Sequence, residues 1–386
     1  MKNSKKNIST TLSRVGLNPI LNYGIPNPPV YHASTILYPN SKSHRTKKVK
    51  YQYGRFGTPT SETFCNAIAD LYDADGSIVA PSGLAAAVVG ILSFIKKGSH
   101  LLVTDSAYGS TRNFISKFLP TIGVEVEFYN PRIKPKEFEK LIKENTSLVY
   151  LESPGSLTFE LQDFPKLCQI TNRLNIKSIA DNTWGTVLGQ NPLNLGVDAV
   201  IESYTKYVSG HSDVMMGGVI ARNNNFRKIK KQAEIMGQCT SPDDIYLAIR
   251  GLRTMEVRLE KSFASSVTIA NWISKISHVK NVFHPATKYH PDNKIFQRDF
   301  NIGAGLFSFE LLEKNPKKID KFIDSLELFG IGASWGGFES LVLQADLENI
   351  RKFENFKNST LIRLAIGLEN PDDLINDLNN AFTKLN

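Results

Sequence analysis

The feature that most constrains the fold of this chain is a regular alternation of short apolar runs and helix-like segments between residues 63 and 257. Three of the apolar runs are 100–104, 125–129 and 147–151. Runs of this length, separated by helical patterns, are typical of a mostly parallel sheet with helices on both faces. We therefore predict an α/β fold with a large domain over residues 63–257.

The segments on either side of this region have different patterns. Residues 1–62 carry prolines at positions 26, 28, 29 and 39, which interrupt regular structure, so we predict an arm that reaches a neighbouring subunit. From residue 258 a long helical pattern precedes a strand-like run at 305–309 and an amphipathic helix near 374–385. We predict a smaller α+β C-terminal domain over residues 258–386.

The composition suits a protein of the reducing cytoplasm. The chain has 386 residues, of which 41% are hydrophobic, enough for about two to three domains of roughly 100–200 residues each. Its three cysteines (Cys65, Cys168 and Cys239) are scattered, which argues against a disulfide framework or a metal site. Residues 1–16 lack the apolar core of a secretory signal, and no apolar run approaches the ~18 residues of a membrane span.

The net charge of +9, from 46 basic and 37 acidic residues, raises the alternative of a nucleic-acid-binding protein. The basic residues cluster only locally, at 42–50 and 227–231. Neither cluster is interleaved with aromatic residues in a recognisable binding module. We therefore expect no nucleic-acid partner, and salt-sensitive retention on DNA would support the alternative.

Within the alternating region, Lys206 is the only lysine between Lys177 and Lys228. It follows the apolar run 199–201 and precedes a Gly-containing turn. A lysine in such a place is often a solvated surface residue. When it is partly desolvated, however, its pKa falls and its amine can form a Schiff base with an aldehyde. The aldehyde most often held in this way is pyridoxal 5′-phosphate, PLP.

PLP chemistry also needs a carboxylate beside the pyridine nitrogen, and Asp181 is the candidate. It follows the short apolar run 176–180 and precedes a polar turn. Ligands of open α/β sheets lie at the carboxyl ends of strands, where both Asp181 and Lys206 are expected. The alternative for Asp181 is a turn or helix-capping residue.

A candidate phosphate site begins at Ser82. Gly83 and Leu84 open an Ala-rich helix, whose free backbone N–H groups would form an anion site. Ser203 and Thr205 flank the lysine segment and could add hydroxyl donors. The alternative is an ordinary helix cap at Ser82.

Arg363 is the candidate for binding a substrate carboxylate. It lies in the middle of the apolar run 360–367, where an unpaired charge is costly. A guanidinium matches a carboxylate with two parallel hydrogen bonds. The alternative is a structural ion pair inside the protein.

Over about residues 28–371 the chain resembles the Cys/Met-metabolism PLP-dependent enzymes of fold type I, and within them the cystathionine β-lyase branch. Each motif alone is weak, but their number, order and spacing make a chance match very improbable. The motifs are Tyr53–Thr58, Pro81–Gly83, Ser106–Tyr108, Glu152–Ser156, Asp181–Trp184, Glu202–Asp213, Arg250–Thr254, Ser334–Leu341 and Ile362–Glu369.

The resemblance implies a role for each candidate in holding the cofactor. Lys206 would bind the PLP aldehyde and move protons, and Asp181 would pair with the pyridine nitrogen. Tyr108 would stack on the ring, or itself remove the α-proton. The phosphate would be held by Gly83, Leu84, Ser203 and Thr205 of one subunit, and by Tyr53 and Arg55 of a neighbouring subunit. The site would therefore need at least a dimer, and the resemblance implies a tetramer.

The resemblance also implies the substrate. Arg363 would bind its carboxylate, with Ser334, Trp335 and Tyr246 at the same pocket. Trp335 and Tyr246 favour the β-lyase branch over γ-specific relatives, as does the motif Glu152–Ser156. The expected reaction is β-elimination of L-cystathionine to L-homocysteine, pyruvate and ammonia in methionine biosynthesis, with cystine or cysteine S-conjugates as further substrates. A cystathionine γ-lyase, a γ-synthase and a methionine γ-lyase are the alternatives.

Two further possibilities concern activity. Reprotonation of the substrate carbanion on its other face would racemise alanine, if Lys206 and Tyr108 lie on opposite faces as the resemblance implies. No separate sequence feature points to this side activity. A non-catalytic scaffold is the remaining alternative, and the joint presence of Lys206, Asp181, Tyr108 and Arg363 argues against it.

Overall fold

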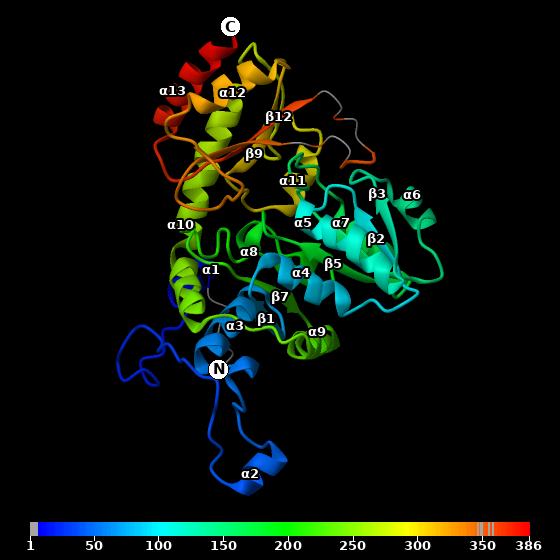
Figure 1. The fold of residues 1–386 in the computed structure, drawn as a ribbon, viewed down its shortest axis with the longest axis vertical. Coiled ribbons are helices and arrows are strands. Elements are labelled where there is room, and N and C mark those ends of the chain that lie inside the picture. The colour runs from blue at the N-terminus through cyan, green and yellow to red at the C-terminus, as the bar shows by residue number, and fades with distance from the viewer. Residues whose placement is uncertain (1–6, 346, 348–349, 354–355, 357–358) are drawn as a thin grey trace.

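The computed structural model describes residues 7–386 except 346, 348–349, 354–355 and 357–358. The chain forms two sheets with helices packed around them. The C-terminal part lies at one end of the long axis of the molecule and the N-terminal arm at the other (Figure 1). This mixed architecture confirms the predicted α/β fold class.

The larger sheet has seven strands in the order β1-β7-β6-β5-β4-β2-β3. The strand β7 runs antiparallel to both of its neighbours, and the other adjacent pairs are parallel. The runs predicted at 100–104, 125–129 and 147–151 are strands β2, β3 and β4. The bounds are β1 (Gly76–Ala80), β2 (His100–Thr104), β3 (Glu125–Tyr129), β4 (Thr146–Glu152), β5 (Lys177–Asp181), β6 (Ala199–Glu202) and β7 (Gly217–Ala221).

Helices cover both faces of this sheet because alternate strand residues are apolar on each side. Tyr150 and Ile179 pack in one hydrophobic cluster with α4, whereas Val149 and Ala180 pack in another with α7. The helices are α3 (Pro59–Tyr72), α4 (Gly83–Leu92), α5 (Gly109–Asn113), α6 (Pro135–Lys140), α7 (Phe164–Arg173), α8 (Thr186–Gly189) and α9 (Asn223–Ile235). Short 3₁₀ or π turns lie at Gly54–Phe56, Phe114–Phe118, Leu119–Ile122, Pro192–Leu195 and Thr383–Leu385.

The smaller sheet has five strands in the order β10-β11-β12-β9-β8. Its hydrophobic core forms against α12, α13 and the end of α10. The predicted strand at 305–309 and helix at 374–385 correspond to β9 and to α13 with its final turn. The bounds are β8 (Val279–Phe283), β9 (Leu306–Leu311), β10 (Gly330–Ile331), β11 (Leu341–Ala345), β12 (Thr360–Ala365), α10 (Pro242–Ile273), α11 (Asn293–Asp299), α12 (Pro316–Asp324) and α13 (Pro371–Phe382).

The long helix α10 joins the two parts. It contacts α1 and α3 of the N-terminal part and β9 and α13 of the C-terminal part. The predicted domain boundary at residues 257/258 falls inside this helix, so the division stays a prediction. Of the helices in the described residues, none is long and apolar enough to cross a membrane.

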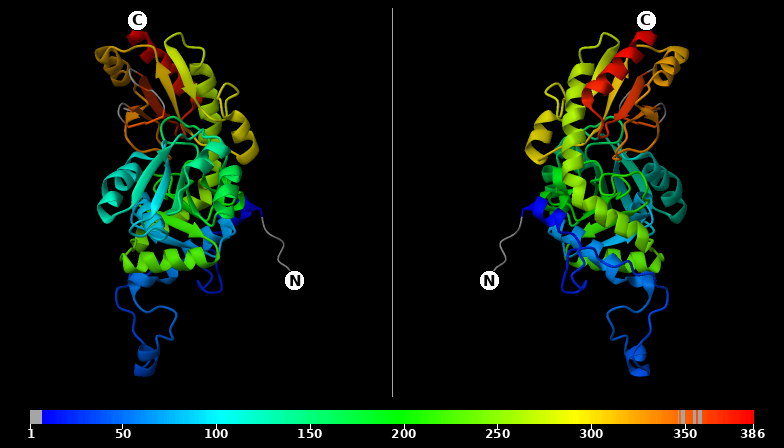
Figure 2. Two further views of the ribbon diagram at one scale, coloured as in Figure 1. Left: turned by 90° about the vertical axis from the view of Figure 1, so that its right-hand side faces the viewer. Right: turned by 90° about the vertical axis from the view of Figure 1, so that its left-hand side faces the viewer.

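The N-terminal arm leaves the body of the protein. The helix α1 (Ile8–Ser13) packs against α10, whereas α2 (Ser41–Thr46) lies at the tip of an excursion that points away from the sheets (Figure 2). Large apolar side chains of the arm are exposed, including Ile20 at 90% and Tyr23 at 96%. Exposed apolar surface of this kind is typical of an interface with another chain.

Candidate functional site

Three parallel strands end side by side in carboxyl residues. Glu152 ends β4, Asp181 ends β5 and Glu202 ends β6. The register pairs Glu152 with Asp181, and Asp181 with Ile201, which precedes Glu202. Ligands of open α/β sheets bind at such an edge. The segment that carries Ser203 and Lys206 leaves β6 from the same edge.

Lys206 is half-buried beside residues of the C-terminal part. Its amine lies 2.8 Å from the Ser334 hydroxyl oxygen and 5.3 Å from the centre of the Trp335 ring. Burial, and secondly the positive charge of Arg363, lower the pKa of Lys206 to about 8. No carboxylate pairs with this amine among the described residues. A substantial fraction is therefore uncharged near neutral pH and available as a nucleophile or base.

Asp181 is held at the strand edge by neutral donors. Its Oδ1 accepts the N–H of Thr183 at 3.0 Å and the hydroxyl of Thr183 at 2.6 Å. Its Oδ2 lies 3.5 Å from the Tyr150 hydroxyl. Burial raises the pKa of Asp181 although these hydrogen bonds oppose the shift. A cation facing this carboxylate, such as a protonated pyridine nitrogen, would stabilise its ionised form.

The start of α4 provides space and donors for an anion. Ser82 caps the helix by accepting the N–H of Ala85 at 3.0 Å, and the N–H groups of Gly83 and Leu84 have no recorded partner in the described chain. A Cβ at Gly83 would lie 2.6 Å from the Ser203 hydroxyl oxygen. The backbone therefore approaches Ser203 so closely that only glycine fits. These features suit a phosphate group.

Thr205 differs from Ser203 in its hydrogen bonding. The Thr205 hydroxyl donates to the carbonyl of Met216 at 3.1 Å and accepts the Met216 N–H at 3.0 Å. It thus closes the loop that carries Lys206. The Ser203 hydroxyl has no recorded partner among the described residues, so Ser203 is the freer donor of the two.

Tyr108 stands at the start of α5 with its side chain 47% exposed. Its backbone N–H donates to Glu152 Oε2 at 2.7 Å, which anchors the residue to the end of β4. The ring itself has no recorded hydrogen bond in the described residues. It is therefore free to cover a flat ligand.

Arg363 lies in the middle of β12 and is 4% exposed. Its two terminal nitrogens donate to the carbonyls of residues 332–334 at 2.6–3.0 Å. Its Nε is buried without a partner, and burial lowers its pKa to about 10. No acidic side chain pairs with Arg363 among the described residues, which argues against the alternative of a structural ion pair. An unpaired, oriented N–H near Lys206 suits a ligand carboxylate.

Three residues that were predicted to belong to the site have no recorded contact with the groups around Lys206 in the described part of the chain. Tyr53 is 44% exposed in the arm. Arg55 donates to the carbonyl of Glu234 at 2.8 Å and stacks on Phe56. Tyr246 is half-buried in α10, and no contact of its ring with the strand edge is recorded for the described residues. The trans action predicted for Tyr53 and Arg55 agrees with this placement and stays a prediction.

Sequence reasoning gave no individual role to Glu152 and Glu202, although each directly follows a predicted strand run. The sequence pattern that could have identified them is a carboxyl residue directly after an apolar run, which is the pattern that indicated Asp181. Burial raises the pKa of Glu152 well above its usual range and that of Glu202 to about 8. The strand edge therefore carries three carboxyl groups, of which Glu152 and Glu202 are buried and Asp181 is half-buried, rather than the single one predicted.

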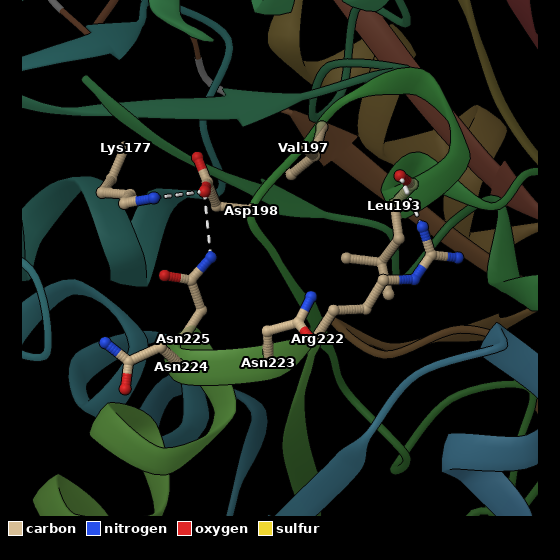
Figure 3. Close-up of a pocket in the computed structure, with 8 residues that line it drawn as sticks. All are labelled: Lys177, Leu193, Val197, Asp198, Arg222, Asn223, Asn224 and Asn225. Carbon is tan, nitrogen blue, oxygen red and sulfur yellow. Dashed lines mark hydrogen bonds and ion pairs between the residues drawn. The ribbon is translucent and has the colours of Figure 1, made fainter. Parts of the chain in front are cut away.

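A surface hollow of about 330 Å³ is separate from this site (Figure 3). Lys177 begins β5 and Asp198 directly precedes β6, so the hollow lies at the amino ends of the strands that Asp181 and Glu202 terminate. Its polar groups satisfy one another, with Asp198 bonded to Lys177 at 2.7 Å and to Asn225 at 2.9 Å. The charged groups of Lys177 and Asp198 are therefore paired with each other.

Comparison with known proteins identifies the family. A family model described as Cys/Met metabolism PLP-dependent enzyme matches residues 9–383. The chain belongs to this family. It is 43% identical to a protein of Rhizobium johnstonii that is provisionally named a cystathionine β-lyase, over 97% of this chain and 96% of the relative.

Other relatives cover the chain almost completely. The cystathionine β-lyase of Escherichia coli is 35% identical over 98% of this chain and 99% of its own length. An L-alanine/L-glutamate racemase of Wolbachia pipientis is 36% identical, covering 94% and 93%. The crystal structure of cystathionine γ-synthase from Xanthomonas oryzae superposes with a TM-score of 0.92 at 26% identity, covering 98% of both chains.

The family and the geometry agree on the cofactor. The family is PLP-dependent, and the strand edge offers an amine of lowered pKa, a half-buried carboxylate and a glycine-lined helix start that suits an anion. These are the groups that PLP requires from a protein. The cofactor is therefore PLP, and the residues present fit it.

Proposed function

We propose that this enzyme is a carbon–sulfur lyase that converts L-cystathionine and water to L-homocysteine, pyruvate and ammonia. The observation that carries the proposal is the position of the Lys206 amine, which lies 2.8 Å from Ser334 and beside Trp335. Two relatives named as cystathionine β-lyases, at 43% and 35% identity, support the β-specific reaction. The γ-synthase structure is more distant, at 26% identity.

Each site residue has a step in this proposal. Bound PLP supplies the electron sink that stabilises negative charge at the substrate Cα. Arg363 binds the α-carboxylate through its unpaired Nε, which orients the Cα proton. Lys206 takes that proton and then gives it to the departing thiolate sulfur, so that the thiol product leaves neutral.

The electrostatics of Lys206 suit both of its proton transfers. A group works best as base and then as acid when its pKa lies near the working pH. The pKa of Lys206, lowered to about 8 by burial and by Arg363, meets this condition. Asp181 would hold the proton on the pyridine nitrogen, and Tyr108 would cover the ring.

The proposed working form is a homo-oligomer in the cytoplasm that serves methionine biosynthesis. Tyr53 and Arg55 would complete the phosphate site of a neighbouring subunit, so a dimer is the minimal active unit and a tetramer is the proposed assembly. The exposed apolar side chains of the arm support an interface there. All three cysteines are free thiols, as suits a reducing compartment.

The test is turnover of L-cystathionine by PLP-loaded enzyme, with pyruvate and free thiol measured together. Equal amounts of pyruvate and homocysteine would support β-elimination. Formation of 2-oxobutyrate and cysteine would instead assign the enzyme to its γ-specific relatives. The Lys206→Ala variant, loaded with PLP in the same way, is the matched control and should be inactive.

Racemisation of alanine is a second candidate activity. The relative named as an L-alanine/L-glutamate racemase, at 36% identity, supports it. Alanine has no β leaving group, so elimination does not compete. L-Alanine and L-glutamate in deuterated water should exchange the Cα proton and yield the D-enantiomers. Retention of the L-form without exchange would exclude this activity.

A further inference from the structure

Thr183 is a buried residue that the proposed reaction does not use. It lies two residues after the end of β5 and is 8% exposed. Its hydroxyl makes two hydrogen bonds at once: it donates to Asp181 Oδ1 at 2.6 Å and accepts the backbone N–H of Ser203 at 2.9 Å. Asp181 is the residue proposed for the pyridine nitrogen of PLP, and Ser203 is proposed for its phosphate. One side chain therefore joins the two ends of the expected cofactor site.

The backbone determines the direction of both hydrogen bonds. The N–H of Ser203 can only donate, so its bond occupies a lone pair of the Thr183 oxygen. The single hydroxyl hydrogen is then left for the carboxyl oxygen on the other side, Asp181 Oδ1. The donation to Asp181 is therefore set by the position of β6 relative to β5 and does not depend on a free rotation of the hydroxyl.

The same hydroxyl continues the pairing of β5 and β6 beyond the ends of the two strands. The backbone N–H of Asn182 donates to the carbonyl of Ile201 at 2.9 Å. Two residues further along the second chain segment, the N–H of Ser203 donates to the Thr183 hydroxyl instead of a backbone carbonyl. This additional hydrogen bond holds Ser203, and the segment that leads from it to Lys206, in a defined position relative to Asp181.

The two oxygens of Asp181 are not equivalent as a result. Oδ1 accepts the hydroxyl and the backbone N–H of Thr183, the latter at 3.0 Å. The N–H contact is an ordinary turn between residues two apart, so it does not depend on the threonine side chain. Oδ2 has one contact recorded in the described chain, the Tyr150 hydroxyl at 3.5 Å, which is at the outer limit for a hydrogen bond. Oδ2 is therefore the oxygen with acceptor capacity to spare.

We propose that Thr183 is a positioning residue that determines which oxygen of Asp181 meets PLP: its hydroxyl, directed by the Ser203 N–H, occupies Oδ1 and leaves Oδ2 for the pyridine nitrogen. The proposal rests on the cofactor site described above. The carboxyl group cannot rotate without losing both hydrogen bonds to Oδ1, so Oδ2 keeps its orientation. A carboxylate that is already oriented binds a protonated nitrogen without a further loss of side-chain freedom.

The test compares how strongly the apoenzyme binds PLP and 1-deaza-PLP, an analogue with a C–H group in place of the pyridine nitrogen. Thr183→Val removes the hydroxyl and keeps the shape of the side chain. It should raise the dissociation constant of PLP at least tenfold, the order expected for loss of one charge-assisted hydrogen bond. It should raise that of 1-deaza-PLP by no more than about threefold, because this analogue has no N–H to donate to Oδ2. Equilibrium dialysis gives both constants.

The alternative role of the Thr183 hydroxyl is only to satisfy the N–H of Ser203. Its loss would then disturb the site in the same way for both cofactors. Equal weakening of PLP and 1-deaza-PLP binding in Thr183→Val would therefore overturn the proposal. Unchanged PLP binding in this variant would overturn it as well.

Two further variants make the result specific. Thr183→Ser keeps the hydroxyl, so its dissociation constant for PLP should stay within about threefold of wild type. Failure of serine to preserve PLP binding would contradict a role of the hydroxyl. Thr171→Val removes a buried hydroxyl of α7 that donates to the carbonyl of Cys168 at 3.2 Å, and should bind both cofactors as wild type does.

This experiment uses no substrate and is independent of the identity of the products. A γ-specific product pattern would refute the proposed β-lyase reaction and leave the result for Thr183 intact. Thermal unfolding of each apoenzyme checks that the variants fold. Thr183→Ala removes the same hydroxyl with less bulk and replaces the valine variant if that variant does not fold, with the same expected and opposing outcomes.

Discussion

At the residue scale, the chemistry of the site depends on the charges that surround one amine. Lys206 has no anionic partner in the described chain and lies near the guanidinium of Arg363, which lowers its pKa further. Arg363 is itself held by three backbone carbonyls rather than by an acid. Lys206 and Arg363 therefore affect each other electrostatically. Substitutions of Arg363 test both its binding of the substrate and its effect on the basicity of Lys206.

Replacing Arg363 should separate its charge from its geometry. Arg363→Gln removes the positive charge, so the pKa of Lys206 should rise. Arg363→Lys keeps a charge but loses the planar fork, so that pKa should stay low. Both variants should raise KM for cystathionine about a hundredfold, the loss of ~3 kcal/mol for a charge-assisted pair. The pKa of Lys206 is measured from the pH dependence of the reaction of the apoenzyme with PLP. An unchanged KM would refute the role of Arg363 in binding the substrate carboxylate.

Lys206 should also make the stability of the apoenzyme depend on pH. Its pKa is about 8 when folded and about 10.4 when unfolded. Between these values the unfolded state binds more protons, so the free energy of unfolding rises with pH in that window. Lys206→Met should be more stable than wild type at pH 7, and the difference should shrink by pH 10. Urea unfolding at the two pH values measures it, and a constant difference would contradict the assigned shift.

At the element scale, the start of α4 and the loop after β6 can form the proposed anion site together because a glycine allows them to touch. A Cβ at Gly83 would meet Ser203 at 2.6 Å, whereas a Cβ at Gly90 on the same helix would meet only ordinary contacts at 3.5 Å. Neither glycine has a positive φ. The two positions therefore differ in the space around them and share the same backbone conformation.

Alanine at these two glycines should have opposite effects. Gly83→Ala should displace Ser203 and weaken PLP binding by tenfold or more, on the order of 1.4 kcal/mol. Gly90→Ala should leave PLP affinity unchanged and raise the free energy of unfolding by up to about 1 kcal/mol, because alanine favours helix over glycine. Equilibrium dialysis with PLP and urea unfolding provide the two measurements. Equal PLP affinity in both variants would argue against the phosphate site.

At the scale of the whole molecule, buried ion pairs attach the C-terminal part to the large sheet. The side chain of Arg351 is 2% exposed and pairs with Asp105 at 3.2 Å and with Glu160 at 2.7 Å. Asp105 also accepts the backbone N–H groups of Lys352 and Phe353. Asp105 lies three residues before Tyr108. The ion pairs of Asp105 therefore also stabilise the segment that carries the Tyr108 ring.

Breaking this attachment should destabilise the protein. Arg351→Met leaves the buried Glu160 without its cation, whereas Asp105 keeps Arg112 at 2.9 Å, and should lower the free energy of unfolding by about 3–5 kcal/mol. Arg173→Met removes a surface pair with Glu139, whose side chains are 59% and 47% exposed, and should cost less than about 1 kcal/mol. Urea unfolding of both variants measures the contrast. Similar losses in the two would show that Arg351 is not a buried anchor in solution.

The proposed dimer predicts that two inactive variants restore activity when they are mixed. Lys206→Ala and Arg55→Ala should each have little activity alone. In a refolded equal mixture, half of the dimers are mixed, and each has one site with an intact Lys206 and an intact Arg55 from the other subunit. Activity should therefore recover to about a quarter of wild type. Absence of recovery, with mixed dimers shown by differential tagging, would place Arg55 outside the neighbouring site.

The sequence predicted the features that depend on neighbours along the chain. Strands β2, β3, β4 and β9 lie where apolar runs indicated them, because a buried strand needs apolar residues on each face it buries. The strand-end positions of Asp181 and Lys206 followed from the same local pattern. Family resemblance added the roles of the motifs, and the match over residues 9–383 confirms that membership.

Only the tertiary structure decided which distant groups meet. Ser334 lies 128 residues from Lys206 in sequence yet contacts its amine, because the order of strands in two sheets brings their loops together. Local periodicity contains no information about that order. For the same reason, the sequence could not show that Thr205 is bonded to Met216, or that Glu202 is buried without a cation. Those properties depend on the groups that surround a side chain in the folded protein.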